Sequence, residues 1–186
     1  MLVKGKQLYL RTFRYTDLDT VYNLLCDIET YGQYFPIFIS SESQLKRDFE
    51  QTGFWGEHNG ELLICDLSDR LLGMMYFFET APYTDGYEIG YRLFDNSNSG
   101  KGIMTEALML CTYLLFSVWD IHRLQLKIDP HNHASRRVAQ KCGYSVEGVA
   151  RGVLKLRDVY HDLEVYSILR SEAPASLDET LTRLSG

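Results

Sequence analysis

The sequence predicts a single α+β domain with a mixed, mostly antiparallel sheet flanked by helices. Short alternating segments joined by brief turns fill the first half of the chain, which is typical of an antiparallel meander. A strand, a long helix and another strand then succeed one another over residues 87–128, an order that makes two strands parallel through a crossover helix. The 186 residues are enough for one domain with a full core.

The first fifty residues predict one strand and two helices. Gln7–Phe13 alternates as a β-strand does. Thr16–Asp17 starts a helix whose apolar residues recur every three or four positions. An aromatic loop over Thr30–Ile39 either walls a substrate cleft or fills the core. The second helix is expected at Ser41–Phe49, with its first residue as N-cap and the glutamine three residues later completing a capping box.

Strand segments dominate the next part of the chain. Trp55–His58 and Glu61–Asp66 flank Asn59–Gly60, a pair that favours a hairpin turn. Leu72–Glu79 is apolar enough for a buried strand, and Tyr87–Phe94 alternates as a fourth strand. The turns between these strands are expected at Ser68–Arg70 and Pro82–Gly86.

The second half of the chain predicts helices alternating with strands. Ile103–Trp119 has the apolar spacing of a long helix, and His122–Ile128 alternates as a strand. Ala134–Lys141 is expected to be a short helix that Gly143 ends. The closing strands are expected at Tyr144–Val149 and Asp158–Leu169.

The domain is expected to span residues 1–170, followed by a polar tail at 171–186. Within this tail, Ala175–Leu184 predicts a loose helix. The two closing strands offer a surface for a homodimer, and the sequence leaves the oligomeric state open.

Composition excludes several classes of protein. The net charge of −6 argues against a nucleic-acid partner, whose phosphates require a basic surface. The four cysteines form no CxxC pair, so reduced thiols in a cytoplasmic protein are expected, with no metal site. No apolar region follows Met1–Lys6, so no signal peptide is expected, and no apolar run approaches the roughly 18 residues that span a membrane.

The loop before the long helix is the strongest candidate for a binding site. It places Gly100 and Gly102 immediately before the helix. Glycines leave backbone amides uncovered, and free amides at the positive end of a helix bind anions. A strand–helix connection is also often Gly-rich for turn reasons alone. The loop by itself therefore leaves both interpretations open.

Four stretches occur in the order of one family's motifs: Leu10–Phe13, Gly100–Ala107, Asn132–Gly148 and Tyr160–Tyr166. The second resembles the coenzyme A pyrophosphate loop of the GNAT superfamily of N-acetyltransferases. The third resembles the N-x-x-S…K-x-G-[FY]…E-G signature of the ribosomal-protein-alanine acetyltransferase (RimJ/RimL-like) branch. The first and last resemble the opening and the closing strand of that branch.

This resemblance implies the GNAT fold, with the parallel strand pair splayed around the cofactor. It also implies that acetyl-CoA is the co-substrate, and that its acetyl group passes directly to a primary amine in a ternary complex. The acceptor is either a protein N-terminus or a small molecule such as an antibiotic or a polyamine. None of the cysteines lies in a recognisable nucleophile motif, which agrees with direct transfer.

The resemblance assigns cofactor contacts to the loop, to the helix that follows it and to the N-x-x-S region. Within the loop, Ser99 stands where relatives usually carry Arg or Gln, and Met104 where Gly or Ala is common. Arg136, Arg137 and Lys141 follow on one short helix, where they either contact the 3′-phosphate of the cofactor or form a solvated basic face, which is the commoner arrangement. The expected contacts are Leu93, Phe94, Asp95, Ser99, Gly100, Lys101, Gly102, Ile103, Met104, Thr105, Asn132, Ser135, Arg137 and Lys141.

The resemblance also suggests catalytic roles. A backbone N–H near Leu93 or Phe94 is expected to stabilise the oxyanion. Ser135 is the first candidate to protonate the thiolate, with Tyr144 as the second, although Ser is also favoured at helix starts. Glu88 is either a base in a partly apolar cleft or a solvated strand residue.

The identity of the base stays open. Some relatives carry a basic Glu in the segment that corresponds to Val153–Lys155, which has no carboxylate here. Water, a remote residue or a relay through His122, His131 or His133 are the alternatives. A non-catalytic acyl-CoA-binding domain is the competing function. A nucleotide-binding protein is disfavoured, because the glycine spacing matches neither phosphate-binding motif.

Overall fold

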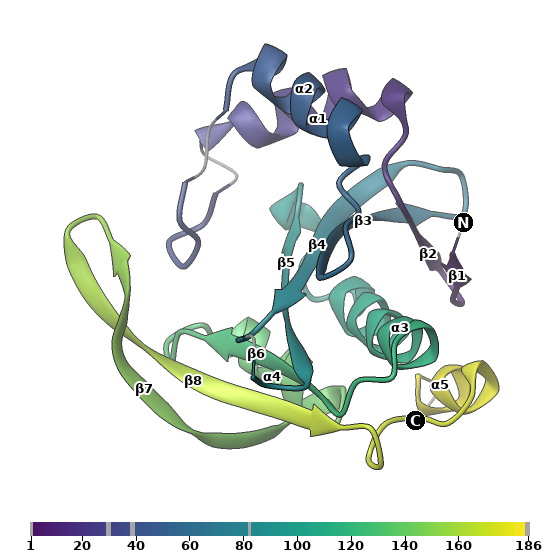
Figure 1. Ribbon diagram of the computed structural model, residues 1–186, viewed down its shortest axis with the longest axis vertical. Coiled ribbons are helices and arrows are strands. Elements are labelled where there is room, and N and C mark those ends of the chain that lie inside the picture. The colour runs from purple at the N-terminus through teal and green to yellow at the C-terminus, as the bar shows by residue number, and fades with distance from the viewer. Residues whose placement is uncertain (1, 29–30, 38–39, 82, 185–186) are drawn as a thin grey trace.

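One eight-stranded sheet organises the protein (Figure 1). The computed structural model describes residues 2–28, 31–37, 40–81 and 83–184. In spatial order the strands are β1 (Val3–Lys4), β2 (Leu8–Arg11), β3 (Asn59–Asp66), β4 (Leu71–Glu79), β5 (Gly86–Leu93), β6 (Arg123–Ile128), β8 (Val159–Leu169) and β7 (Ser145–Leu156). Every neighbouring pair is antiparallel except β5 and β6. The α+β fold class is confirmed.

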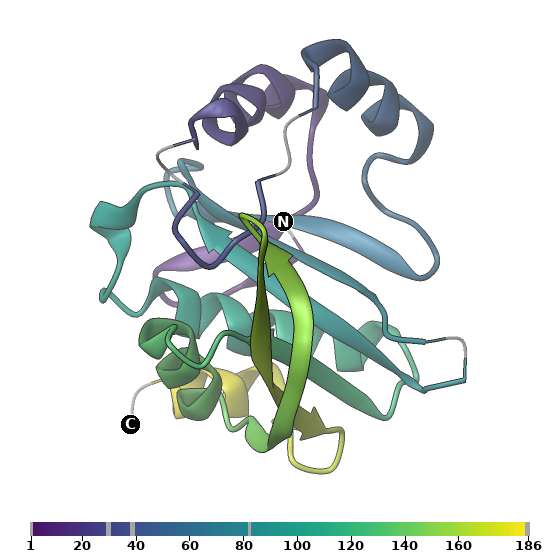
Figure 2. The ribbon, with the colours of Figure 1, turned by 90° about the vertical axis from the view of Figure 1, so that its left-hand side faces the viewer.

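Helices cover both faces of this sheet (Figure 2). The helices α1 (Leu18–Cys26) and α2 (Glu42–Thr52) lie over one face, and α3 (Ile103–Val118), α4 (His133–Lys141) and α5 (Leu177–Arg183) lie over the other. The strand β3 contributes apolar side chains to the hydrophobic clusters on both faces of the sheet, because successive side chains of a strand point to opposite faces. Leu62 and Ile64 join the larger core with α3, whereas Leu63 and Cys65 join the smaller cluster with α1.

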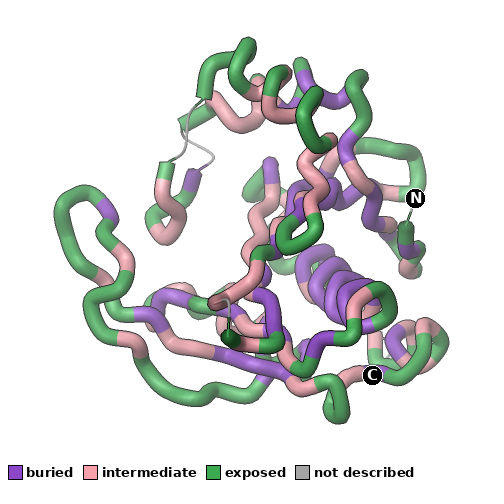
Figure 3. Tube along the Cα trace, viewed as in Figure 1, coloured by how far each residue is buried: buried purple, intermediate pink, exposed green. Residues whose placement is uncertain are grey.

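The helix α3 is the centre of the larger core, and most of its length is buried (Figure 3). Its one buried carboxylate, Glu106, accepts hydrogen bonds from the backbone amides of Lys6 (2.6 Å) and Gln7 (3.0 Å). The first turn of α3 therefore holds the start of the chain. Among the described residues, no helix combines the length and apolarity needed to cross a bilayer.

The motif at Leu10–Phe13 has a structural role, which Arg11 carries. Arg11 is buried and forms a bidentate ion pair with Asp17, at 2.6 and 2.9 Å. It also contacts Asp69 of the β3–β4 turn at 3.1 Å. Asp69 in turn accepts hydrogen bonds from Tyr9 and Arg14. This network fixes the chain where it leaves the sheet for α1.

The parallel pair is confirmed and is short. The β5–β6 ladder joins Gly86–Glu88 to Arg123–Gln125. In the part of the chain that the structure describes, no pairing between these strands continues beyond this point. The last residues of β5 therefore have an open edge, and this splay positions the candidate site.

Four local predictions are wrong. Trp55–His58 is not a strand, because only Trp55 pairs, in an isolated bridge with Gly60. Asn59–Gly60 begins β3 instead of forming a turn, and glycine is needed there because a Cβ on Gly60 would lie 2.7 Å from the Phe77 ring and 2.9 Å from Trp55. The Ser41 N-cap is confirmed, but the Gln44 side chain donates to an aspartate one turn later instead of completing the capping box. The strand β7 extends well past residue 149. Both its faces are largely exposed and its register is interrupted twice, so apolar alternation does not mark it.

Some expectations concern residues outside the described ranges. The aromatic loop at 30–39 includes 30, 38 and 39, and the turn at 82–86 includes 82, all of which lie outside them. The predicted helix in the C-terminal tail is present as α5. Leu177 and Leu181 pack against the larger core, and Thr180 is fully buried. The described part of the tail is thus integrated with the α3 layer.

We expect one carboxyl of the sheet to make stability depend on pH. Glu61 is partly buried on β3, and burial raises its pKa to about 7. Because the folded state holds the proton more tightly, stability falls as pH rises from about 4.5 to 7. Glu61→Gln removes this component, so the variant gains stability relative to the wild type across that range. Urea unfolding at several pH values measures this difference, and the exposed Glu57→Gln should show none.

Candidate active site

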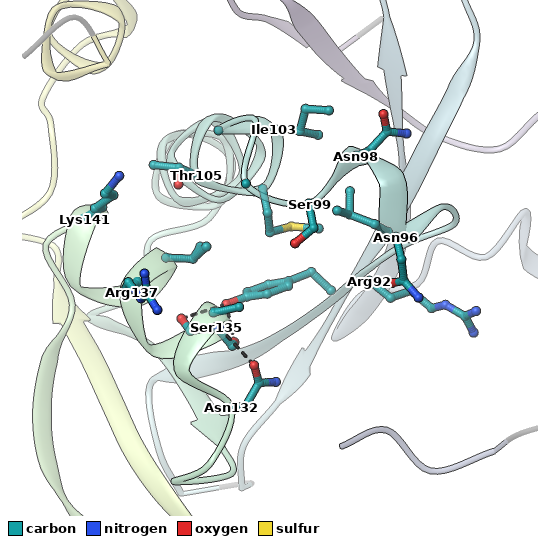
Figure 4. A pocket seen from close by; sticks show the side chains of 17 residues that line it. Arg92, Asn96, Asn98, Ser99, Ile103, Thr105, Asn132, Ser135, Arg137 and Lys141 are labelled. Carbon is teal, nitrogen blue, oxygen red and sulfur yellow. Dashed lines mark hydrogen bonds between the residues drawn. The ribbon is translucent and has the colours of Figure 1, made fainter. Parts of the chain in front are cut away.

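A cavity of about 560 Å³ lies where the splay of β5, the start of α3 and the start of α4 meet (Figure 4). Its walls come from three segments that are distant in sequence. β5 supplies Tyr91, Arg92 and Leu93, and the loop and first turn of α3 supply Asn96, Asn98, Ser99, Gly100, Gly102, Ile103, Met104 and Thr105. Asn132 and α4 supply Asn132, Ala134, Ser135, Arg137, Val138 and Lys141.

The loop wall presents backbone amides. Gly100 and Gly102 have φ of 77° and 79°, a left-handed conformation that favours glycine. The first-turn amides of Ile103, Met104 and Thr105 make no hydrogen bond to any described residue. Unpaired amides at the start of a sixteen-residue helix form an anion site. This arrangement supports the interpretation of the loop as a phosphate-binding segment.

The opposite wall presents two cations. Arg137 and Lys141 are four residues apart, so they lie on the same face of α4, and both line the cavity. Arg136 points elsewhere and pairs with Glu164 at 2.8 Å. Lys101 does not line the cavity, and its Nζ lies 3.4 Å from Asn98. Amides on one wall and cations on the other fit a polyanion with two separated phosphate groups.

A pair of hydroxyls lies on the wall between β5 and α4. Tyr91 Oη and Ser135 Oγ are 2.7 Å apart, and burial raises the pKa of Tyr91 above its ordinary value. The phenol therefore keeps its proton at neutral pH. Asn132 orients this wall, because its side chain caps α4 and accepts a hydrogen bond from the Ser135 amide at 3.1 Å.

Tyr91 was absent from the residues expected at the site. The alternation of the fourth strand carries the relevant signal, since Tyr91 shares a strand face with the buried Tyr87 and Ile89. What the sequence does not contain is the contact with Ser135, which is 44 residues away and depends on how α4 docks against the splay.

The two backbone candidates for the oxyanion are distinguished by the sheet. The Phe94 amide donates to Leu72 O at 3.0 Å, so it is already occupied. Amides alternate between the two edges of a strand. Leu93 N–H therefore points away from β4, toward the open edge of β5. The Phe94 side chain is buried in the smaller cluster, and Asp95 caps the 3₁₀ helix at Asn96–Asn98.

Two other candidates for catalysis lie outside the cavity wall. Tyr144 is buried, its Oη is 2.8 Å from Thr112 Oγ1, and it does not line the cavity. Glu88 lies where the two strands still pair, with Lys127 Nζ at 2.9 Å and a hydrogen bond from Gln125 at 3.0 Å. Of the three catalytic candidates, only Ser135 lines the cavity.

A second, smaller cavity of about 90 Å³ opens on the other side of the splay. Tyr91, Asn132 and Ser135 line it as well as the first cavity. Its remaining wall combines three aromatic rings with aliphatic side chains, Gly90 and Lys127. A Cβ on Gly90 would overlap the Tyr76 ring, so the absence of a side chain at this position gives Tyr76 its place. The other lining residues are Tyr34, Phe35, Ile89, Leu126, Lys127 and Ile128.

Comparison with known proteins agrees with this geometry. A family model described as acetyltransferase (GNAT) domain matches residues 7–145. A probable N-acetyltransferase, YjcK, from Bacillus subtilis is 30% identical over 92% of this chain and 98% of its own length. The ribosomal-protein-serine acetyltransferase of Escherichia coli is 26% identical over 79% of this chain and 84% of its own length.

A solved structure shows the same fold. The spermidine N-acetyltransferase from Vibrio cholerae, in complex with CoA and spermine, superposes with a TM-score of 0.76 at 20% identity, over 89% of this chain and 97% of that one. The chain therefore belongs to the GNAT superfamily, in its ribosomal-protein-acetyltransferase (RimJ/RimL-like) branch, and is an acetyl-CoA-dependent N-acetyltransferase.

Proposed function

We propose that this enzyme passes the acetyl group directly to a primary amine held in the smaller cavity. The observation that carries the proposal is that Tyr91 and Ser135 line both cavities. A thioester in the larger cavity and an amine in the smaller one would meet at this pair. Such an arrangement favours a ternary complex, because it orients both reactants before bond formation.

The larger cavity would hold acetyl-CoA, which supplies the activated acetyl group. The amides of Ile103, Met104 and Thr105 would bind its pyrophosphate. Arg137 and Lys141 would bind its 3′-phosphate. Ser99 contributes only a short side chain where a long donor is usual, so the backbone amides carry most of this contact.

Three groups at the splay would carry the chemistry. Leu93 N–H donates a hydrogen bond to the carbonyl oxygen as negative charge develops there. Ser135 gives its hydroxyl proton to the departing thiolate. Tyr91, whose oxygen lies 2.7 Å from Ser135 Oγ, holds that hydroxyl in place and keeps its own proton because its pKa is raised.

The cysteines support transfer without an acyl-enzyme. Burial raises the pKa of Cys65 to about 11 and those of Cys111 and Cys142 to about 12. The thiolate is the nucleophilic form of cysteine, and these thiols stay protonated at neutral pH. None of the four cysteines of the chain, Cys26 included, lines either cavity. The acceptor amine is therefore the attacking group.

The smaller cavity suggests the form of the acceptor. Its volume of about 90 Å³ and its aromatic wall of Tyr34, Phe35 and Tyr76 suit an amine carried on a narrow stem. A protein N-terminus and an unbranched small amine such as a polyamine both meet this description. A thiol-release assay with acetyl-CoA, comparing a peptide that has a free N-terminus with spermidine, tests both classes. Absence of release with every primary amine would contradict the proposal.

Removing the Ser135 hydroxyl should slow turnover more than it weakens cofactor binding. Ser135→Ala is expected to lower kcat by about 100-fold or more, since general acid catalysis contributes roughly 10²–10⁴-fold. The affinity for acetyl-CoA, measured by calorimetry, should change by less than about threefold, because the phosphate contacts lie elsewhere. Tyr91→Phe should give a smaller decrease in kcat. Unchanged turnover in Ser135→Ala would remove this residue from the mechanism.

A further inference from the structure

A histidine and a buried carboxylate form a pair beside the smaller cavity. His161 of β8 places its Nδ1 3.0 Å from Asp129 Oδ2, at the point where β6 ends. The Asp129 side chain is only 3% exposed, whereas that of His161 is 31% exposed. The carboxylate is thus sequestered, and the imidazole has one side toward solvent.

Hydrogen bonds connect this pair to the cavity wall. Tyr34, which lines the smaller cavity, donates to His131 O at 2.9 Å. The His131 amide donates to Asp129 Oδ1 at 2.8 Å. Ile128 and Asn132, on either side of Asp129 in sequence, also line this cavity. The Asp129–His161 pair therefore lies behind the wall of the smaller cavity, and neither residue of the pair lines the cavity itself.

The pairing determines which ring nitrogen of His161 is available. An ionised carboxylate only accepts hydrogen bonds, so the neutral imidazole carries its proton on Nδ1 and donates it to Asp129. Nε2 is then left with a lone pair. Within the described residues, Nε2 has no hydrogen-bond partner. A base oriented by a third group, with its other nitrogen free, is the arrangement that proton-accepting histidines require.

The carboxylate candidate near the splay, Glu88, is less suitable as a base. The Glu88 carboxylate is held by Lys127 and Gln125. His131 contributes its backbone amide and carbonyl to this region. In the closing strands, Leu154 pairs directly with His161 across the β7–β8 ladder. The side chains at this pair therefore share one face of the hairpin.

We propose that His161 serves as the base of the reaction, with Nε2 accepting a proton that reaches it from the acceptor ammonium through a bridging water, and that Asp129 is its positioning residue. This inference rests on the proposed function, since it names the base for that reaction. The same chemistry favours acceptors that arrive as ammonium ions, which must lose a proton before attack.

The transfer of one acetyl group to an ammonium acceptor releases one proton overall. The acceptor ammonium gives one proton, through a bridging water, to His161 Nε2 and becomes a neutral amine. Its lone pair forms the new C–N bond while the C–S bond breaks, and the sulfur takes the Ser135 proton. The nitrogen loses a second proton, which restores the serine hydroxyl through ordered water. His161 releases the first proton to solvent, so the net products are amide, thiol and one proton.

The test measures kcat/KM for thiol release across a range of pH, with spermidine and with a peptide that has a free N-terminus. His161→Gln is expected to lower kcat/KM by about 100-fold near pH 7, in the range of general base catalysis. This deficit should shrink as pH approaches the pKa of the amine itself, because more of the acceptor is then already neutral. Added imidazole should partly restore His161→Ala. Asp129→Asn should show a similar deficit at pH 7.

Controls separate this inference from the proposed function. His58→Gln, which alters an exposed imidazole that lines neither cavity, should match the wild type. Calorimetry should show unchanged acetyl-CoA affinity in His161→Gln. Equal kcat/KM in His161→Gln and wild type, or a deficit that neither pH nor imidazole alters, would overturn the role of His161 while leaving acetyl transfer intact. No thiol release by the wild type would overturn both.

Discussion

Arg11→Ala should destabilise the protein more than any surface substitution. The change would leave the largely buried Asp17 carboxylate without its bidentate cation, and breaking a buried pair from one side costs about 3–5 kcal/mol. For a chain of this size we expect the melting temperature to fall by roughly 6–20 °C. Thermal and urea unfolding, monitored by circular dichroism, measure this loss directly.

A neighbouring arginine provides the matched control. Arg14 also pairs with Asp69, but their side chains are 51% and 45% exposed. Exposed ion pairs contribute about 0–1 kcal/mol, so Arg14→Ala should shift the melting temperature by a few degrees at most. If the two variants unfolded alike, charge near Asp69 rather than the buried Arg11–Asp17 pair would account for the stability.

Gly102→Val should abolish useful affinity for acetyl-CoA while the protein remains folded. Gly102 has φ of 79°, where a β-branched residue is strained, so the substitution should rotate the backbone at the start of α3. That rotation would misalign the Ile103 and Met104 amides, and each charge-assisted hydrogen bond contributes about 1.5–3 kcal/mol. Loss of both bonds predicts at least a roughly 100-fold weaker Kd by calorimetry.

Gly53→Val separates strain from binding. Gly53 has φ of 63° at the end of α2, and a Cβ there would meet no heavy atom within 4 Å. The substitution therefore introduces similar backbone strain far from the cavity. We expect it to lower stability and to leave the acetyl-CoA affinity unchanged. Wild-type affinity in a folded Gly102→Val would contradict the assignment of the loop.

The order of elements and the phosphate loop could be predicted because their causes are local in sequence. Apolar spacing marks α3, and Gly100 and Gly102 mark the loop before it. The motif with Asn132 and Ser135 is likewise local, because one side chain caps the helix that carries the other. The local structure around such residues can be predicted because it depends on residues only a few positions away in the sequence.

Other parts depend on contacts between distant segments, which sequence patterns do not encode. Tyr91 and His161 each depend on the docking of another element, respectively α4 and the end of β6. The sequence also could not show that Glu88 is engaged by Lys127, because this ion pair follows from the β5–β6 register. Gly60 resembled a turn residue because the rings packed over it lie elsewhere in the sequence.

The two hydrogen bonds that Glu106 accepts from the start of the chain have a consequence for the thermodynamics of cofactor binding. This carboxylate accepts hydrogen bonds from the amides of Lys6 and Gln7, and it lies in the first turn of α3, directly after the amides that face the larger cavity. The beginning of the chain thereby braces the same helical turn that receives the phosphates. The backbone of that turn is ordered when the protein folds, so the cofactor meets a preorganised surface and association incurs little additional conformational entropy.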